Sequence, residues 1–200
     1  MNAWICSFSE RVAKVEIAAV IVLTGLIPAL VITNVLSRIA KMPIYWIDEA
    51  SILAMIWLAL IGTSLSIKKR DSLSVELLAE LVENRMVAIM VLVLSDISAI
   101  LFGSIFLVLC YIWFDPVLLY SVGFDFAEFS SVSFNFVYEE QTQTMSIAKF
   151  WFWLVLPVIG TTITLHGVAN LAEVIRTRGR RQAPSAISNS ELEIERGRMQ

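Results

Sequence analysis

Residues 46–85, WIDEASILAMIWLALIGTSLSIKKRDSLSVELLAELVENR, decide the fold of this chain. Within them, residues 50–67 form an apolar run of 18 residues without a charge, and three basic residues, 68–70, end it. About 20 apolar residues span the hydrocarbon core of a bilayer, and lysine and arginine collect on its cytoplasmic side. The stretch therefore predicts a membrane-spanning helix over residues 47–67 that ends at the cytoplasmic face.

The amphipathic stretch that follows, residues 72–84, predicts a further helix. Its leucines recur at helical spacing on one stripe, and its glutamates lie on another face. With 13 residues and three acids, it is too short and too charged to span a bilayer. We therefore predict a cytoplasmic amphipathic helix whose stripe, Leu73, Leu77 and Leu81, rests either on lipid or on a partner subunit.

The composition and three further apolar runs extend this topology. The chain has 200 residues, of which 58% are hydrophobic and only 16% are charged, whereas soluble domains carry about 25% charged residues. Residues 17–37, 86–114 and 150–172 form the other long runs, and only Asp96 interrupts one of them. We therefore predict an all-α integral membrane protein with four transmembrane helices plus the cytoplasmic amphipathic interfacial helix.

The distribution of positive charge orients these helices. With both termini cytoplasmic, 12 of the 15 lysines and arginines lie inside, and Arg38, Lys41 and Lys149 lie outside. This asymmetry follows the rule that cytoplasmic loops carry the positive charge. Residues 1–16 then form a cytoplasmic N-terminus, and the polar residues 179–200 form a cytoplasmic tail whose composition indicates disorder.

The connection over residues 115–148 is long, acidic and aromatic. Its 34 residues include five acids and no lysine or arginine. An alternation of apolar residues between Val132 and Tyr138 is weakly typical of a strand. We predict an outer loop that packs against other parts of the protein, where it either docks a partner or covers the outer face.

The acidic residues near or within the crossings are candidates for chemistry. Asp96 either relays a proton or Na⁺, or makes a polar contact with a neighbouring helix. Asp48 and Glu49 are adjacent, so on a helix they point about 100° apart and do not converge on one atom. We predict that this pair makes contacts at the outer surface, where Arg38 and Lys41 are the candidate cations.

His166 is the only histidine in the chain. A metal site built from several histidines is therefore impossible within this chain. A single histidine in an apolar run is typical of a helix contact, and we predict that role for His166.

An ordered set of residues resembles a known family. In the first two crossings and the loop between them the set is Arg38, Pro43, Trp46, Asp48, Glu49, Trp57 and Gly62, followed by Val75 and Glu76, and in the last crossing it is Leu156, Pro157 and Gly160. With four crossings, this set resembles the DctQ-like small membrane subunit of TRAP (tripartite ATP-independent periplasmic) transporters over residues 17–178. Ile39 and Ser72 stand where the family usually has tyrosine and histidine, and the third connection is unusually long.

The resemblance implies a function and partners. DctQ-like subunits assemble with a large membrane permease subunit and a periplasmic substrate-binding protein in the bacterial inner membrane. The large subunit carries the substrate site and the coupling-ion site, with Na⁺ as the expected ion, and the substrates are usually organic acids. The resemblance thus implies a non-enzymatic scaffold that has no cofactor or metal of its own and contacts the lipid bilayer, with no nucleic-acid partner.

The family pattern, the leucine stripe and the intramembrane acid together give the candidate partner-interface residues. They are Arg38, Trp46, Asp48, Glu49, Trp57, Gly62, Leu73, Leu77, Leu81 and Asp96. Two alternatives stay open at this point. One is a membrane enzyme or proton-conducting protein that uses Asp96 and His166, and the other is a membrane scaffold or sensor unrelated to TRAP transport.

Overall fold

The computed structural model describes residues 2–69 and 85–177 of the chain. Three sequence predictions fall elsewhere: the amphipathic helix over residues 72–84, its stripe of Leu73, Leu77 and Leu81, and the tail over residues 179–200. These predictions lie outside the described residues.

The described part of the chain is helical, and four of its helices are long and apolar enough to cross a membrane. In chain order they are α1 (Asn2–Ile39), α2 (Trp46–Lys69), α4 (Arg85–Phe114), and the pair α7 (Phe150–Trp153) and α8 (Val155–Thr177), which together form the last crossing. The predicted all-α membrane protein with four transmembrane helices is confirmed.

Helix α1 is much longer than the apolar run from which it was predicted. At a rise of 1.5 Å per residue, its 38 residues extend about 57 Å, whereas the hydrocarbon core of a bilayer is about 30 Å thick. Residues 2–16 therefore continue the helix beyond the run at 17–37. The longer helix carries Ser9 and Glu16 into contact with other helices, where both are buried.

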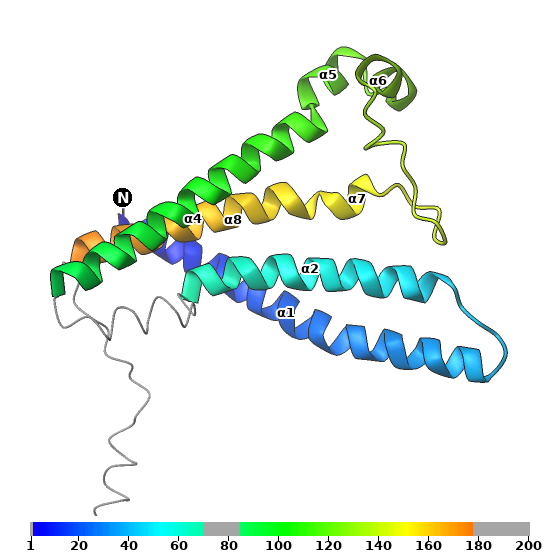
Figure 1. Cartoon of the computed structure of the whole chain (residues 1–200), viewed down its shortest axis with the longest axis horizontal. Helices are drawn as coiled ribbons and strands as arrows, with labels where there is room; N and C mark the ends of the chain where they lie inside the picture. Colours follow the sequence, from blue (N-terminus) through cyan, green and yellow to red (C-terminus); the bar gives the residue numbers. More distant parts are fainter. Residues whose placement is uncertain (1, 70–84, 178–200) are drawn as a thin grey trace, which may run out of the picture.

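Helix α8 lies at the centre of the bundle, because it contacts α1, α2 and α4. Helices α1 and α2 form an antiparallel hairpin (Figure 1). Figure 1 shows that the four long helices converge at the end that carries Lys68 and Lys69 and fan out toward the other end. We call the first the basic end and the second the strap end, after the strap, residues 134–149, which lies there (Figure 1).

Glycines allow the close contact between α4 and α8. A Cβ atom at Gly103 would lie 2.5 Å from Thr164 Oγ1, and one at Gly167 would lie 2.8 Å from Ile100 Cγ1. Small residues of this kind let the backbones of membrane helices approach one another. Gly62 on α2 differs, because a Cβ atom there would have no atom of the described chain within 4 Å.

The connection between α4 and α7 folds into a cap of two short helices and a strap. Asp115 and Asp125 accept backbone N–H bonds at the starts of α5 (Pro116–Ser121) and α6 (Phe126–Ser133), as expected of side chains at helix N-caps. Residues 134–149 then pass from α6 toward α2 and into α7 (Figure 1). We call these residues the strap.

The strand suggested by the alternation between Val132 and Tyr138 is wrong. Within the described residues there is one isolated β-bridge, Gln141 with Ala148, and no strand. The alternating apolar residues do not share one buried face, because Tyr138 packs into the cap, whereas the side chain of Phe136 is exposed.

Two apolar cores hold this arrangement together. The first joins α1, α2 and α8 through Leu23, Ala54, Ile61, Ile159 and Ile163. The second lies under the cap and consists of Cys110, Phe114, Phe129, Val137 and Tyr138. The hydroxyl of Tyr138 donates to the carbonyl of Phe114 at 2.6 Å. Burial, together with the negative charge of Asp115, raises the pKa of this phenol, which favours its protonated, hydrogen-bonding form.

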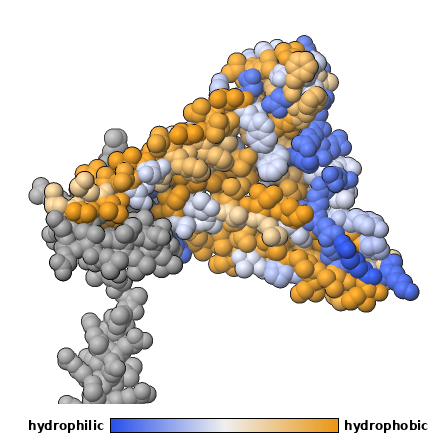
Figure 2. All heavy atoms as spheres, in the orientation of Figure 1, coloured by the Kyte–Doolittle hydropathy of each residue, from blue (hydrophilic) through white to orange (hydrophobic). Residues whose placement is uncertain are grey.

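The flanks of the long helices are apolar. Figure 2 shows hydrophobic residues over the visible flanks of α1, α2 and α4, whereas hydrophilic residues gather along the strap end. The exposed side chains of α4 include Leu94, Leu101, Ile105 and Val108. Soluble monomers rarely expose continuous apolar patches larger than a few hundred Å². These flanks are therefore surfaces for lipid or for another membrane protein.

Candidate functional site

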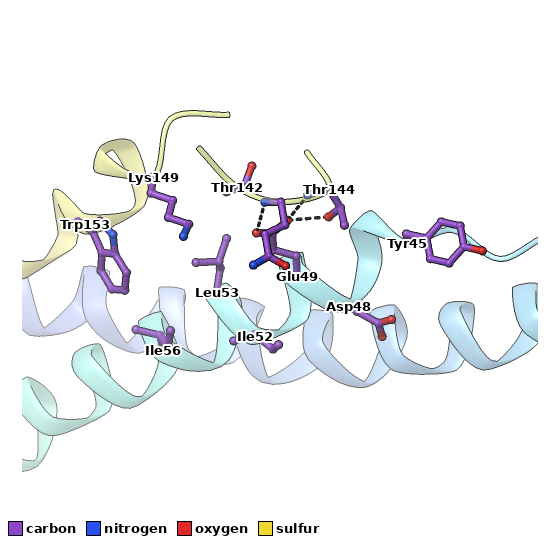
Figure 3. Close-up of a pocket in the computed structure, with 11 residues that line it drawn as sticks. Tyr45, Asp48, Glu49, Ile52, Leu53, Ile56, Thr142, Thr144, Lys149 and Trp153 are labelled. Atoms are coloured by element: carbon purple, nitrogen blue, oxygen red, sulfur yellow. Dashed lines mark hydrogen bonds between the residues drawn. The ribbon is translucent and has the colours of Figure 1, made fainter. Parts of the chain in front are cut away.

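Glu49 anchors the strap to the first turn of α2. Its Oε1 accepts the backbone N–H of Gln143 at 2.9 Å, and its Oε2 accepts the backbone N–H of Thr144 at 2.8 Å and the Thr144 hydroxyl at 2.6 Å. Figure 3 shows the carboxylate pointing from α2 into the turn of the strap. One carboxylate thus joins two segments that lie more than 90 residues apart in the sequence.

Asp48 points away from this anchor and holds α1 instead. Its Oδ2 lies 2.5 Å from Nη2 of Arg38, and its Oδ1 accepts a hydrogen bond from the side-chain amide of Asn34. Of the two candidate cations, Arg38 forms the ion pair. The two adjacent acids diverge as predicted (Figure 3). Together they connect α2 to α1 on one side and to the strap on the other.

A cavity of about 450 Å³ opens between α2, the strap and the start of α7. We call it the strap cavity. Its apolar wall consists of Ile52, Leu53, Ile56 and Trp153, and its polar lining includes Tyr45, Asp48, Glu49, Thr142 and Lys149 (Figure 3). Next along α2, the indole N–H of Trp57 donates to the carbonyl of Phe152 at 3.0 Å and ties α2 to α7.

A buried polar cluster links α1, α2 and α8 nearer the basic end. The two ring nitrogens of His166 lie 2.8 Å from the Ser9 hydroxyl and 3.1 Å from Glu16 Oε2. The Ser64 hydroxyl donates to Glu16 Oε1 at 2.7 Å and lies 2.7 Å from the hydroxyl of Thr162. Ser9, Ser64 and His166 are fully buried, and Glu16 is 6% exposed. We call these five residues the polar cluster.

The polar cluster was only partly predictable. The role of His166 as a helix contact is confirmed, since it joins α8 to α1. The other members were not predicted: the structure brings Glu16 together with Ser9, Ser64 and Thr162 in a buried group between the helices. Glu16 precedes the apolar run by one position, so the run gave no sign that the helix continues through it.

Asp96 lies in α4 at the contact with α8. Its side chain is 5% exposed, and its carbonyl oxygen would lie 3.5 Å from a Cβ atom at Gly167. This position fits a polar residue held between helices. Among the described residues, no group of three or more histidine, cysteine, aspartate or glutamate side chains is placed to hold a metal ion.

The other candidate residues are distributed along the outside of the hairpin. Trp46 is the first residue of α2 and is 46% exposed. Gly62 faces open space within the described chain. The structure therefore brings Arg38 and Asp48 together, places Glu49 and Trp57 in contacts with the strap and α7, and leaves Gly62 accessible to another molecule. Roles for these residues at a partner interface stay predictions.

The fold agrees with a comparison against known families. The family described as "Tripartite ATP-independent periplasmic transporters, DctQ component" matches residues 27–177. The chain belongs to the DctQ family. Comparisons with curated proteins and with solved structures gave no match. The family match confirms the resemblance seen in the sequence and identifies this multi-pass membrane protein as the small component of a TRAP transporter.

Only part of the polar cluster of this DctQ chain lies within the residues that match the family. Ser64, Thr162 and His166 lie inside the matched residues, whereas Ser9 and Glu16 precede them. Both sites described above are positioned by the crossings themselves: the strap anchor by the first turn of α2, and the polar cluster by the meeting of α1, α2 and α8.

Proposed function

We propose that this DctQ chain is the scaffold subunit of a transporter that takes up an organic acid by cation-coupled symport. It packs against a large membrane permease subunit, which holds the substrate and the coupling ion, expected to be Na⁺. It also helps to dock a periplasmic substrate-binding protein. The observation that carries the proposal is the apolar outer flank of a four-crossing bundle, in a chain that belongs to a family of transporter components.

The contact with the large subunit is supported by Gly62. Glycine is a poor helix former, and in membrane helices small residues are enriched where another helix approaches closely. Gly103 and Gly167 serve this purpose inside the chain, but Gly62 has no neighbour within 4 Å of where its Cβ would lie. The face of α2 around Gly62 is therefore a suitable seat for a helix of the large subunit.

The assignment of substrate and ion sites to the large subunit follows from charge. A carboxylate substrate requires an arginine, a lysine or a helix N-terminus at mid-membrane depth. No lysine or arginine lies in the four predicted crossings, residues 17–37, 47–67, 86–114 and 150–172. The buried Glu16 would repel an anion rather than bind it.

Docking of the binding protein is assigned to the strap end. This assignment rests on the proposed orientation, with both termini in the cytoplasm and the strap in the periplasm of a bacterial inner membrane. The strap end carries exposed acids such as Glu128 and Glu139 and exposed aromatics such as Phe134. Aromatic side chains surrounded by polar residues are common in protein interfaces.

Uptake assays test the proposal. A strain that lacks the chain should lose uptake across a panel of labelled organic acids, and the complete chain should restore it. Asp96→Asn should leave the apparent KM of the transported acid within about twofold, because a scaffold residue contributes no binding energy to the substrate. A large rise of KM in this variant, with the complex assembled, would instead support the alternative in which Asp96 lies in an ion or proton pathway.

A further inference from the structure

The strap cavity has the size of a ligand site and lies where the chain enters the membrane. Its volume of about 450 Å³ falls within the range of about 300–1,000 Å³ that is usual for small-molecule sites. Two tryptophans, Trp46 and Trp153, lie at this end of the bundle, and tryptophans favour the interface between lipid headgroups and hydrocarbon. The cavity therefore spans the boundary between polar and apolar surroundings.

The shape of the strap cavity fits a flexible chain better than a helix. Its lining extends along α2 from Tyr45 to Ile56, a distance of about 16 Å. A helix is about 10–12 Å across with its side chains. A single hydrocarbon chain is much thinner and fits the space between α2 and the strap better than a helix of another subunit does.

The inner half of the cavity is apolar. Ile52, Leu53 and Ile56 line it from α2, and Trp153 lines it from α7. Figure 3 shows these side chains on the side of the cavity that lies toward the middle of α2, beyond the carboxylate of Glu49. Apolar side chains placed in this way favour an acyl chain that enters from the membrane.

The outer half of the cavity carries charges of both signs. The ammonium of Lys149 pairs with Glu140 at 2.5 Å, which leaves N–H groups for a second acceptor. The carboxylate of Glu49 accepts three hydrogen bonds, and a carboxylate accepts about four. Asp48 also lines the cavity, but it is paired with Arg38, so the Asp48–Arg38 and Glu140–Lys149 pairs are each neutral and Glu49 leaves a net charge of −1.

We propose that the strap cavity binds one zwitterionic phospholipid whose headgroup carries a primary ammonium. The phosphate lies at Lys149, the ammonium lies at the carboxylate of Glu49, and one acyl chain lies along Ile52, Leu53 and Ile56. A headgroup with only negative charge brings no cation to Glu49, so it is disfavoured. This site needs only a chain in a membrane and does not rest on the proposed transport function.

Native mass spectrometry of lipid-bound protein tests the proposal. The complete chain is reconstituted in bilayers of equal parts phosphatidylethanolamine and phosphatidylglycerol, extracted in mild detergent, and analysed for retained lipid. We expect one phosphatidylethanolamine per chain. Ile56→Trp, which fills the apolar half, should retain about tenfold less phosphatidylethanolamine. Two methylene groups of the acyl chain would no longer be buried, and their burial is worth about that factor in affinity. Ile105→Trp, on the exposed flank of α4, is the matched control and should retain lipid normally.

The headgroup is tested separately at Lys149. Lys149→Gln should weaken retention of phosphatidylethanolamine by severalfold, and Lys149→Arg should preserve it, since either cation can bind a phosphate. Equal retention of both lipids in all variants, or unchanged retention in Ile56→Trp with an unchanged melting temperature, would overturn the proposal. A side chain of the large subunit crosslinked inside the cavity, with no lipid retained in the purified complex, would also overturn it.

Discussion

Glu49 and Asp48 are adjacent, yet they hold different parts of the molecule. The carboxylate of Glu49 accepts bonds from the strap, and that of Asp48 accepts bonds from α1. Because successive helical residues point about 100° apart, one acidic pair at the start of α2 connects the helix to two neighbours. This geometry gives the pair a structural role that does not require the two carboxylates to share a ligand.

The strap anchor can be tested with a matched pair of variants. In Glu49→Gln one carboxylate oxygen becomes an amide NH₂, which cannot accept the strap N–H bonds. The backbone amides of Gln143 and Thr144 should then exchange hydrogen severalfold faster, as measured by hydrogen–deuterium exchange of the purified chain. Asp48→Asn is the control and should leave these amides protected. Equal acceleration in both variants would show that the strap is not held by Glu49.

Substitutions in the polar cluster should lower the stability of the chain. His166→Ala removes a hydrogen-bond partner from the buried carboxylate of Glu16, and a buried group left unsatisfied costs about 1–3 kcal/mol, with more for a charged group. Replacing both residues by leucine should cost less than the two single changes combined, because no polar group is left without its partner.

Thermal unfolding of the purified variants in detergent gives these energies. Ser64→Ala, which also removes a bond to Glu16, should lower the melting temperature, whereas Ser66→Ala on the exposed side of α2 should not. Additive single and double changes at Glu16 and His166 would mean that the two residues do not act as a unit.

At the level of elements, the glycines separate contacts within the chain from contacts outside it. Gly103→Leu places a side chain where Thr164 already lies, so α4 and α8 should separate and stability should fall by about 1–3 kcal/mol. Gly62→Leu meets open space within the described chain, so the chain should keep its melting temperature but lose the large subunit on co-purification. If the Gly62→Leu variant co-purifies with the same amount of large subunit as the unsubstituted chain, a partner helix does not pack on this face of α2.

The sequence predicted the long elements well because their signal is strong. An uncharged run such as residues 50–67 has few stable alternatives to a membrane helix. Helix α2 begins one residue before the predicted span of residues 47–67 and ends two residues after it. Glu16 was missed because apolarity marks where a helix is buried in lipid, not where the helix ends. The strap anchor was missed because nothing local at residues 143 and 144 indicates a bond to a residue more than 90 positions away.

The prediction of a strand in the connection between α4 and α7 failed for a different reason. The alternating apolar residues of this connection look like a strand, but Val132 lies in α6 and the Asn135 side chain accepts the backbone N–H of Val137. These local hydrogen bonds replace those that a partner strand would supply. Aromatic packing around Tyr138 then fixes the rest of the connection, and such packing leaves no periodic pattern in the sequence.

At the level of the whole molecule, the fold has two distinct ends. The start of α1, the end of α2 and the end of α8 lie at the basic end, and the cap and the strap lie at the other (Figure 1). The excess of lysine and arginine at the basic end and in the tail predicts that this end faces the cytoplasm.

Single cysteines test this orientation in a background without Cys6 and Cys110. Ser121→Cys, in α5 at the strap end, should react with an impermeant thiol reagent added to intact cells. Ser188→Cys, in the tail, should react only after the membrane is permeabilised. Labelling of Ser188→Cys but not of Ser121→Cys in intact cells would reverse the orientation.

We infer that this DctQ chain works as one subunit of a membrane assembly rather than alone. Its bundle has apolar flanks, a glycine face without a neighbour in the described chain, and a buried polar cluster enclosed among its own helices. Affinity purification of the tagged chain from its native membranes tests this assembly most directly. We predict that a larger polytopic permease co-purifies with the chain in a fixed ratio and is lost with Gly62→Leu. Recovery of the chain alone, or only with copies of itself, would contradict its role as one subunit of an assembly.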